Sequence, residues 1–224
     1  MTMLSSLELM RRVPLFSVLN DAQLRTVAEA VVKRRFKRGE AIVEQGKTSN
    51  ALFILLNGRA RVVASNSQGR EVILAVLEQG DHVGEMSLID NEPHSATVRA
   101  EMQTDVLMLG SDEFARSLRE NPSTAYTVMR SLVQRLRHAS RRIETLALMD
   151  VYGRVARALL EFAEDIGNGQ MMIRGKVSRQ DIAKMIGASR EMVSRVMKGL
   201  EENGFIQTQD NGSILIKDPI STLC

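Results

Sequence analysis

The chain has 224 residues with a formal net charge of +3, 44% apolar residues and only 4% aromatic residues. This length allows one large domain or two small ones, with cores built mainly from aliphatic side chains. The one cysteine, Cys224, excludes an internal disulfide, a cysteine-ligated iron–sulfur cluster and a cysteine-based zinc site within one chain. No apolar run approaches the ~18 residues of a membrane span, and the N-terminus lacks the apolar stretch of a signal peptide. We therefore expect a cytoplasmic protein without a membrane partner.

The first half of the chain predicts short helices followed by short strands. Over residues 5–32, apolar residues recur at helical spacing, and Asn20 is placed to cap one of the helices. From residue 35 to 109, glycines separate apolar runs that are each about one strand long. Short strands at such regular spacing predict a small antiparallel sandwich or barrel.

Two turns in this region are predicted to form hairpins. Asn57 and Gly58 separate the apolar runs Leu52–Leu56 and Ala60–Ala64. An Asn-Gly pair suits a two-residue type I′ turn because both central positions need a positive φ. Residues 65–69 predict the next hairpin.

A long helix is predicted next. Ser111 is expected to cap a short helix to about Arg119, and Ser123 to start a helix that runs to Leu148 or Met149. Along the long helix, apolar residues alternate at spacings of 4 and 3, which is the heptad pattern of a coiled coil. The residues of this stripe are Ala125, Met129, Leu132, Leu136, Ala139, Ile143 and Leu146.

The stripe has two interpretations. It packs either against the chain's own β-structure or against an identical chain in a parallel coiled coil. Five arginines and no acidic residue lie between Arg130 and Arg142. We favour the homodimer, because the stripe is narrow and arginines flank it.

The last third of the chain predicts further helices. Asp150 is expected to cap a helix from Val151 to about Asp165, so the domain boundary is placed at residues 148–150. Gly167, Asn168 and Gly169 predict a turn between two short apolar pieces.

Two short helices with a glycine turn between them follow. Ser178 begins the first helix, with Asp181 three residues later as in a capping box. Gly187 supplies a tight turn, and Ser189 caps the second helix, which runs from Arg190 to about Glu202. Two helices joined in this way form the helix-turn-helix arrangement.

The residues around this unit carry the charge expected of a surface that binds double-stranded DNA. Phe205–Thr208 and Ser213–Lys217 flank the turn pair Asn211-Gly212, which predicts a β-hairpin wing. Between residues 174 and 198, seven basic residues are opposed by two acidic ones. The second helix would enter the major groove, where arginine can bind guanine and glutamate can bind cytosine. The candidate DNA contacts are Ser178, Arg179, Ser189, Arg190, Glu191, Ser194, Arg195 and Lys198.

Two plainer interpretations compete with DNA binding. A run of charges is often only a solvated face, and a winged helix can serve protein contacts alone. The sequence Ser189–Arg195, with a capping serine followed by Arg190 and Glu191, disfavours the second.

Three parts of the chain resemble the CRP/FNR family of bacterial regulators. Gly84–Leu88, followed by His94–Ala96 and Val98–Ala100, is similar to that family's phosphate-binding cassette. Met149–Arg154 resembles its hinge, and Val177–Ile206 resembles its DNA-recognition unit. The resemblance extends over nearly the whole chain, and these three motifs carry it.

The resemblance implies an α+β fold with an N-terminal antiparallel β-roll of the cyclic nucleotide-binding type. A long central dimerisation helix and a C-terminal winged helix-turn-helix would follow. The expected divisions are a sensor domain at 1–122, a dimerisation helix and hinge at 123–149, and a DNA-binding domain at 150–224. The resemblance also implies a two-fold operator with TGTGA-like half-sites and RNA polymerase as a partner.

Two branches of the family are represented in the second helix. Arg190, Glu191 and Arg195 match the residues that read bases in the cyclic AMP receptor proteins. Ser194 instead matches the pattern of the oxygen-sensing branch, which leaves the half-site sequence open.

The resemblance also places an effector site in the cassette and on the long helix. Successive backbone N–H groups after a glycine can cradle an anion, and Glu85 could accept a hydrogen bond from a ribose hydroxyl. The candidate effector-binding residues are Gly84, Glu85, Met86, Ser87, His94, Ser95, Arg135 and Ser140.

Departures from the family pattern weaken the case for cyclic AMP. His94 stands where the cyclic AMP branch has an arginine, and Ala139 replaces a threonine. A neutral histidine offers neither a permanent charge nor a fork of donors. The arginine run on the long helix would suit a larger anion, such as the cyclic dinucleotide cyclic di-GMP. The alternative is a degenerate cassette that is kept for structure.

The sequence thus favours a dimeric transcription regulator over two other classes. An enzyme is disfavoured because no nucleophile–base pair or metal cluster appears outside the sensor and DNA-reading segments. A constitutive DNA-binding protein with an empty pocket is the remaining alternative. DNA affinity with and without nucleotides would separate it from a sensor.

Overall fold

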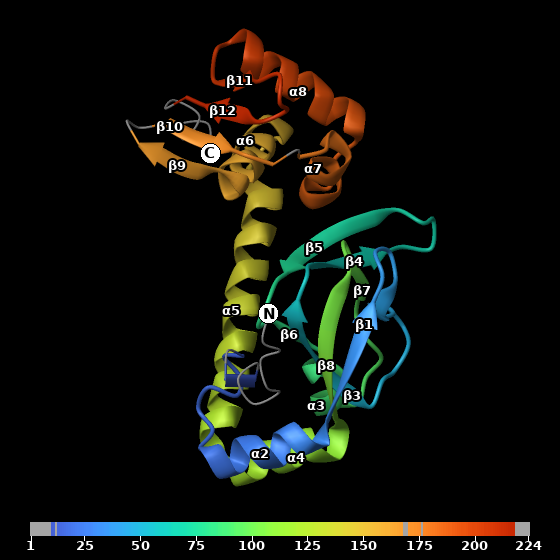
Figure 1. The fold of residues 1–224 in the computed structure, drawn as a ribbon. Coiled ribbons are helices and arrows are strands. Elements are labelled where there is room, and N and C mark those ends of the chain that lie inside the picture. The colour runs from blue at the N-terminus through green and yellow to red at the C-terminus, as the bar shows by residue number, and fades with distance from the viewer. Residues whose placement is uncertain (1–9, 12, 168–169, 176, 218–224) are drawn as a thin grey trace. The chain divides into compact units, whose positions relative to one another are not determined.

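The computed structural model describes residues 10–11, 13–167, 170–175 and 177–217 (Figure 1). The chain divides into two compact units, one up to Arg135 and the other from Leu136 onward. Among the described helices, none is both long enough and apolar enough to cross a bilayer. The predicted combination of a β-rich N-terminal region, a long helix and a helix-turn-helix is confirmed.

Helix α2 (Asp21–Ala30) of the first unit has a capped N-terminus. The Asn20 side chain accepts a hydrogen bond of 3.0 Å from Gln23 N, and Gln23 Oε1 accepts one of 3.0 Å from Asn20 N. The predicted cap is therefore confirmed as a full capping box. The helix ends before residue 32, because Val31 already begins strand β1 and pairs with Leu109.

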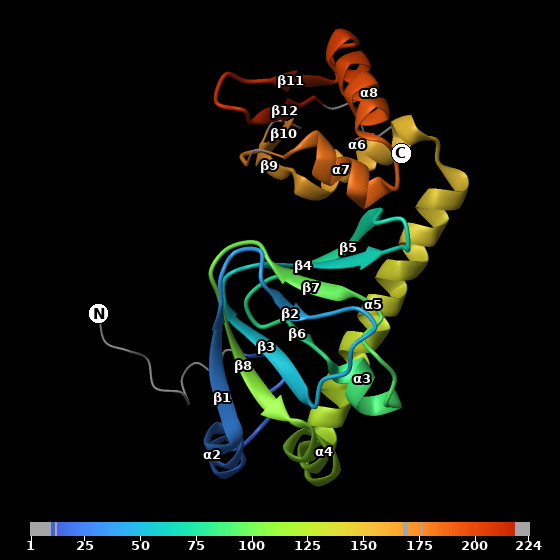
Figure 2. The same ribbon diagram turned by 90° about the vertical axis from the view of Figure 1, so that its right-hand side faces the viewer.

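Two antiparallel four-stranded sheets form the β-structure of the first unit (Figure 2). One sheet has the order β1 (Val31–Phe36), β8 (Thr104–Gly110), β3 (Ala51–Asn57), β6 (His82–Val83). The other has the order β2 (Ala41–Val43), β7 (Thr97–Ala100), β4 (Ala60–Ser65), β5 (Glu71–Leu77). The core between them contains Leu55, Val98 and Val106. Strand β3 is buried on both faces, which explains its continuous apolar run.

The prediction of a hairpin at Asn57-Gly58 is wrong. The two residues lead from β3 in one sheet to β4 in the other, so the flanking strands do not pair. Gly58 has a φ of 99°, but the backbone of Asn57 is not left-handed, and a type I′ turn needs both. A Cβ atom at Gly58 would lie 2.5 Å from Thr104 Oγ1. A glycine is therefore needed where the chain passes close to Thr104. The predicted hairpin over residues 65–69 is confirmed by the pairing of β4 with β5.

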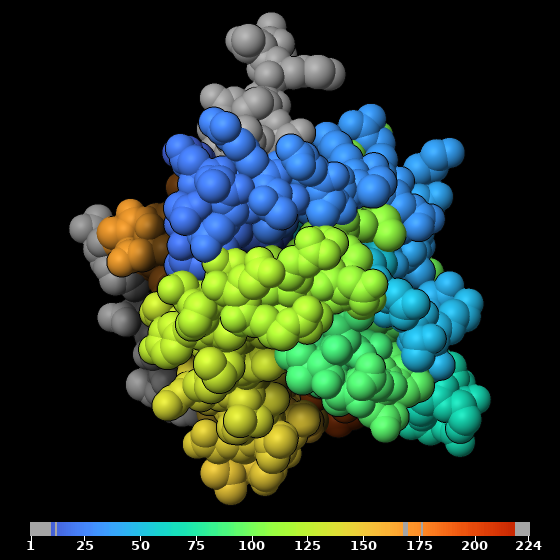
Figure 3. Space-filling view, turned by 90° about the horizontal axis from the view of Figure 1, so that it is seen from below, coloured from blue at the N-terminus to red at the C-terminus, as the bar shows by residue number. Residues whose placement is uncertain are grey.

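Helices cover the other face of the first sheet. They are α2, α4 (Ser111–Glu120) and the first part of α5 (Pro122–Leu148), and Figure 3 shows α2 and α4 side by side. Leu24 of α2, Phe114 of α4 and Val128 of α5 share one apolar core with the sheet. The predicted cap at Ser111 is wrong, because Gly110 is the N-cap and Ser111 is the first helical residue. Helix α5 starts one residue before Ser123, at Pro122, since a first helical position needs no N–H donor.

The second unit contains the end of α5 and three further helices. Asp150 caps α6 (Val151–Phe162) by accepting a hydrogen bond of 2.8 Å from Gly153 N, as predicted. Helix α6 ends earlier than Asp165, because β9 (Glu164–Gly167) pairs with β10 (Gln170–Ile173). Asn168 and Gly169 of the predicted turn lie outside the described residues.

The helix-turn-helix and its wing are confirmed in the second unit. Helices α7 (Arg179–Ile186) and α8 (Arg190–Glu202) are followed by the hairpin of β11 (Ile206–Thr208) and β12 (Ile214–Ile216). The wing is larger than predicted, since the sheet has the order β11-β12-β10-β9. One apolar core joins α6, α7, α8 and this sheet.

Candidate functional site

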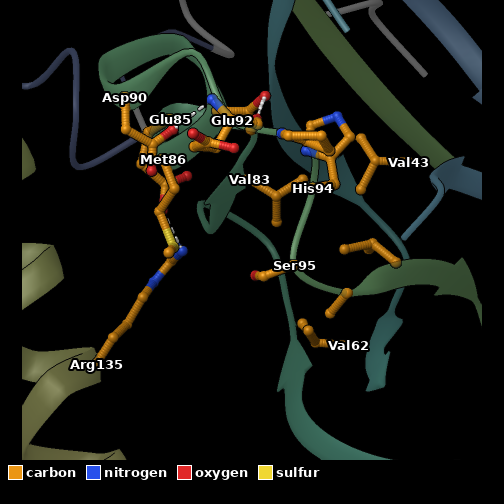
Figure 4. A pocket seen from close by; sticks show the side chains of 15 residues that line it. Val43, Val62, Val83, Glu85, Met86, Asp90, Glu92, His94, Ser95 and Arg135 are labelled. Atoms are coloured by element: carbon orange, nitrogen blue, oxygen red, sulfur yellow. Dashed lines mark hydrogen bonds and ion pairs between the residues drawn. The ribbon is translucent and has the colours of Figure 1, made fainter. Parts of the chain in front are cut away.

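A pocket of about 190 Å³ lies in the first unit, beside the start of α3 (Glu85–Asp90) (Figure 4). Seven of the eight predicted effector residues line it: Gly84, Glu85, Met86, Ser87, His94, Ser95 and Arg135. Residues far apart in the sequence are therefore brought together. The eighth, Ser140, belongs to the second unit, where its hydroxyl donates a hydrogen bond of 3.0 Å to the Leu136 carbonyl.

The entry into α3 requires a glycine. Gly84 has a φ of 96°, in the left-handed region, and is the N-cap of the helix. A Cβ atom there would lie 2.7 Å from the Ala51 carbonyl oxygen, so a larger residue would displace β3. Three residues after Gly84, Ser87 Oγ donates a hydrogen bond of 2.5 Å to the Glu92 carbonyl, which ties the start of α3 to the loop that follows the helix.

An ion pair between a buried carboxylate and a half-buried arginine occupies one side of the pocket. Glu85 is only 1% exposed, and its Oε1 atom lies 2.6 Å from Arg135 Nη1. Arg135 Nη2 also donates a hydrogen bond to the His82 carbonyl. Burial raises the pKa of the Glu85 carboxyl, and the charge of Arg135 partly opposes this. Among the described residues, Glu85 Oε2 is buried and has no hydrogen-bond partner.

Histidines near the pocket are neutral at physiological pH. The His94 ring nitrogen Nε2 lies 2.8 Å from Ser49 Oγ, and burial lowers the pKa of this imidazole. His82 is more deeply buried, and burial together with the charge of Arg135 lowers its pKa to about 4. His94 therefore supplies no fixed charge to an anion, as the sequence indicated.

Helix α8 presents one buried and one exposed face. Val193, Met197 and Leu200 are buried against the second unit's core. The predicted contacts Arg190, Glu191, Arg195 and Lys198 are exposed, and Ser194 is half-buried. Basic side chains thus lie where a duplex could reach them.

Two serines predicted as DNA contacts cap their helices. Ser178 Oγ accepts a hydrogen bond of 3.0 Å from Asp181 N at the start of α7, next to the exposed Arg179. Ser189 Oγ accepts one of 3.2 Å from Met192 N at the start of α8. Hydrogen bonds from its own backbone and from Ser189 lower the pKa of Glu191, so its carboxylate is ionised. On the exposed side of α8, Lys198 Nζ lies 3.5 Å from Glu202 Oε1.

The apolar stripe of α5 is divided between two environments. Leu132 packs partly buried against the core of the first unit, and Ala125 is half-buried. The remaining predicted positions are exposed: Met129, Leu136, Ala139, Ile143 and Leu146. Both interpretations of the stripe thus have residues that fit them.

Sequence reasoning missed three exposed large apolar residues of α5, one of which, Leu148 at the end of the helix, is 78% exposed. Tyr126 is 65% exposed and Val133 is 48% exposed. Tyr126 and Val133 lie one position after Ala125 and Leu132 of the predicted stripe. Together with Met129, Leu136 and Ile143, which both stripes share, they form a second heptad pattern. The sequence contains both registers, because Val133 follows Leu132 directly. The two registers differ in burial, because Leu132 of the predicted register packs with Val128 against the core of the first unit, whereas Val133 is exposed.

Comparison with known proteins agrees with this arrangement. A cyclic nucleotide-binding domain family matches residues 33–121, and a Crp-like helix-turn-helix domain family matches residues 153–220. The cAMP-activated global transcriptional regulator Vfr of Pseudomonas aeruginosa is 33% identical over 183 residues, which cover 79% of this chain and 86% of that protein. The cAMP-activated global transcriptional regulator CRP of Salmonella typhimurium is 30% identical, covering 77% and 83%.

Solved structures share the fold. That of CLP, the c-di-GMP responsive global regulator of Xanthomonas campestris, matches with a TM-score of 0.76 at 22% identity, covering 88% of this chain and 99% of that one. The chain therefore belongs to the CRP/FNR family of DNA-binding transcription regulators and carries a cyclic nucleotide-binding domain.

Proposed function

We propose that this regulator acts as a homodimer that reads a two-fold operator with TGTGA-like half-sites. The observation that carries the proposal is the exposed face of α8, where Arg190, Glu191 and Arg195 project away from a buried apolar stripe. Arginine can bind guanine O6 and N7 with two hydrogen bonds, and glutamate can accept from cytosine N4. RNA polymerase is the proposed partner in transcription.

Dimerisation is proposed to use the exposed apolar residues of α5. Met129, Leu136 and Ile143 are 55%, 67% and 67% exposed, which is costly for side chains of this size in an isolated chain. Their heptad spacing suits a parallel coiled coil with a second copy. Two copies would place two α8 helices about 34 Å apart, as successive major grooves require.

Binding-site selection with the purified protein tests the reading residues. The wild type should recover a two-fold sequence, and Arg190→Ala should lose preference at one base pair of each half-site, worth about 1–3 kcal/mol. Lys198→Ala is the matched control, because Lys198 is also an exposed cation of α8 but lies about two turns further from its N-terminus. It should weaken binding to all sequences alike. Unchanged base preference in Arg190→Ala would contradict the assignment.

The pocket is proposed to bind a nucleotide-like anion. Arg135 is the one arginine among the described residues that line the pocket, and no lysine lines it there. Because Glu85 already holds Arg135 at 2.6 Å, a phosphate would have to share or replace that partner. A neutral His94, in place of a permanently charged arginine, argues against cyclic AMP. Cyclic di-GMP is a candidate, since CLP is described as responsive to it.

A second candidate is a regulator that needs no effector. The Glu85–Arg135 pair favours it, because two side chains of the protein itself join the start of α3 to α5. The degenerate-pocket alternative then predicts DNA binding at full strength by the protein alone.

Calorimetry and DNA binding, each with cyclic AMP, cyclic GMP and cyclic di-GMP at one salt concentration, separate the two candidates. An effector should release heat, change DNA affinity and bind Arg135→Ala more weakly than wild type. Arg130→Ala, which removes an exposed arginine of α5 outside the pocket, should bind it normally. No heat and no change in DNA affinity with any nucleotide would favour the effector-independent regulator.

A further inference from the structure

Helix α5 contacts the end of α7 and the turn that follows it through one face of its second half. Within the second unit, His138, Arg142 and Leu146 are spaced four residues apart and so share this face. The charge of Glu161 in α6 acts on both His138 and Arg142. Leu146 Cδ2 lies 3.9 Å from the position that a Cβ atom would take at Gly187. The face therefore lies against α6 and the turn between α7 and α8.

Arg142 reaches the end of α7. Its Nη2 atom donates a long hydrogen bond of 3.4 Å to the Met185 carbonyl, while Arg154 Nη1 of α6 donates one of 2.9 Å to the Ile186 carbonyl. The last carbonyls of a helix lack partners inside the helix, and its dipole favours a cation there. Burial lowers the pKa of the Arg142 guanidinium. A charge that is partly removed from water is attracted to carbonyl oxygens more strongly than a hydrated one.

The contact lies where the direction of α8 is set. Gly187, with a φ of 65°, ends α7, and Ser189 already caps α8. The two helices are thus separated by a short turn in which the first residue is left-handed. Holding the Met185 carbonyl at the end of α7 consequently limits the directions that α8 can take.

We propose that Arg142 is a positioning residue that holds the reading helix α8 in a fixed direction relative to the second half of α5. The inference rests on the proposed dimeric, DNA-reading function. In a dimer, the second half of α5 leads from the coiled coil to the reading helix. Arg142 then fixes the distance and rotation between two reading helices without contacting DNA itself.

The spacing of half-sites tests this role. The probe is the duplex recovered by selection with the wild type, compared with the same duplex lengthened by one base pair between its half-sites. One base pair rotates the half-sites by about 34°, so the wild type should strongly prefer the original. Arg142→Ala should bind the original roughly tenfold more weakly and lose most of this preference. Arg142→Lys, which keeps a cation able to donate, should restore part of it.

A matched variant and a salt series complete the experiment. Arg141→Ala removes the same charge from the exposed neighbouring position and should keep the spacing preference. Loss of a phosphate contact lowers the slope of log affinity against log salt by about 1, whereas Arg142→Ala should leave the slope unchanged.

The possible results distinguish a failure of the positioning role of Arg142 from a failure of the proposed dimeric DNA binding. A folded Arg142→Ala variant that keeps the spacing preference, or one with a lowered salt slope, overturns the positioning role. If circular dichroism shows that Arg142→Ala is unfolded, the same two criteria are applied to Arg142→Gln, which keeps a donor without the charge. A wild type that shows no spacing preference overturns the proposed dimeric function and the inference with it.

Discussion

The two units use arginine in different ways. In the first unit, Arg135 is held by the buried carboxylate of Glu85 beside the pocket. In the second unit, Arg190 and Arg195 are exposed on α8, whose other face is buried. A duplex can therefore meet the arginines of α8 without breaking any buried interaction. An anion that is to use Arg135 must compete with a charge that is already in place.

This difference separates a preformed surface from a site that must rearrange. Removing one partner from a buried ion pair costs more than forming an exposed pair gains. An effector that displaces Glu85 would leave that carboxylate buried, and burial already raises its pKa. The displaced carboxylate would then either take up a proton or accept a hydrogen bond from a hydroxyl of the ligand. Effector binding should thus depend on pH, whereas base reading by α8 should depend mainly on salt.

The largest expected effect comes from the helix that both units share. Leu136→Glu places a charge at a position that is 67% exposed in the chain but central to the proposed dimer. It should make the protein monomeric and reduce operator affinity about 100-fold or more, because the two reading helices are no longer linked. Sedimentation and DNA binding measure the two effects. Gln134→Glu, which introduces the same residue at another exposed position, should remain dimeric. A dimeric Leu136→Glu protein would exclude the proposed seam.

The sequence was most informative where the signals are local. The caps at Asn20, Asp150, Ser178 and Ser189 each depend on a side chain and a backbone N–H within three residues. The apolar faces of α7 and α8 likewise follow from helical spacing, so the DNA-reading unit could be predicted almost entirely.

Features set by distant contacts could not be predicted in the same way. Gly58 was expected in a hairpin, yet its role is set by Thr104, and the end of α6 is set by the pairing of β9 with β10. The partner of Glu85 is Arg135, which is 50 positions away. The resemblance placed both residues at the effector site, but their pairing depends on how α5 packs on the sheet. The register of the α5 stripe depends on the same packing.

The next largest effect tests the buried groups beside the pocket. The His82 ring has a pKa of about 4 because burial disfavours its charged form. In the unfolded chain this histidine takes up a proton near pH 6.5, so the folded state binds fewer protons between these values. Its contribution to the free energy of unfolding should therefore fall as the pH is lowered from about 6.5 to 4, by roughly 3 kcal/mol in total.

Comparison with a variant isolates this contribution, since Glu85 acts in the opposite direction. The pKa of Glu85 is raised, so at pH values just above the ordinary pKa of a glutamate the folded state binds more protons than the unfolded state. Acidification through this range therefore stabilises the folded state at Glu85. His82→Leu should lose clearly less stability than wild type on acidification, measured by denaturant unfolding of the first unit at several pH values. Equal losses in both proteins would show that His82 is not buried as a neutral group.

The smallest expected effect compares one serine from each unit, both predicted from sequence to be caps. Ser189 is a cap, since its Oγ accepts a hydrogen bond from Met192 N, whereas Ser111 is the first residue of α4 and Gly110 takes the cap position. Ser189→Ala should lower the free energy of unfolding of the second unit by about 1 kcal/mol. It should also weaken DNA binding several-fold, because the first turn of α8 frays. Ser111→Ala should change the stability of the first unit by less than about 0.5 kcal/mol. Chemical denaturation of both variants measures the contrast, and a loss at Ser111 as large as that at Ser189 would mean that both hydroxyls cap their helices in solution.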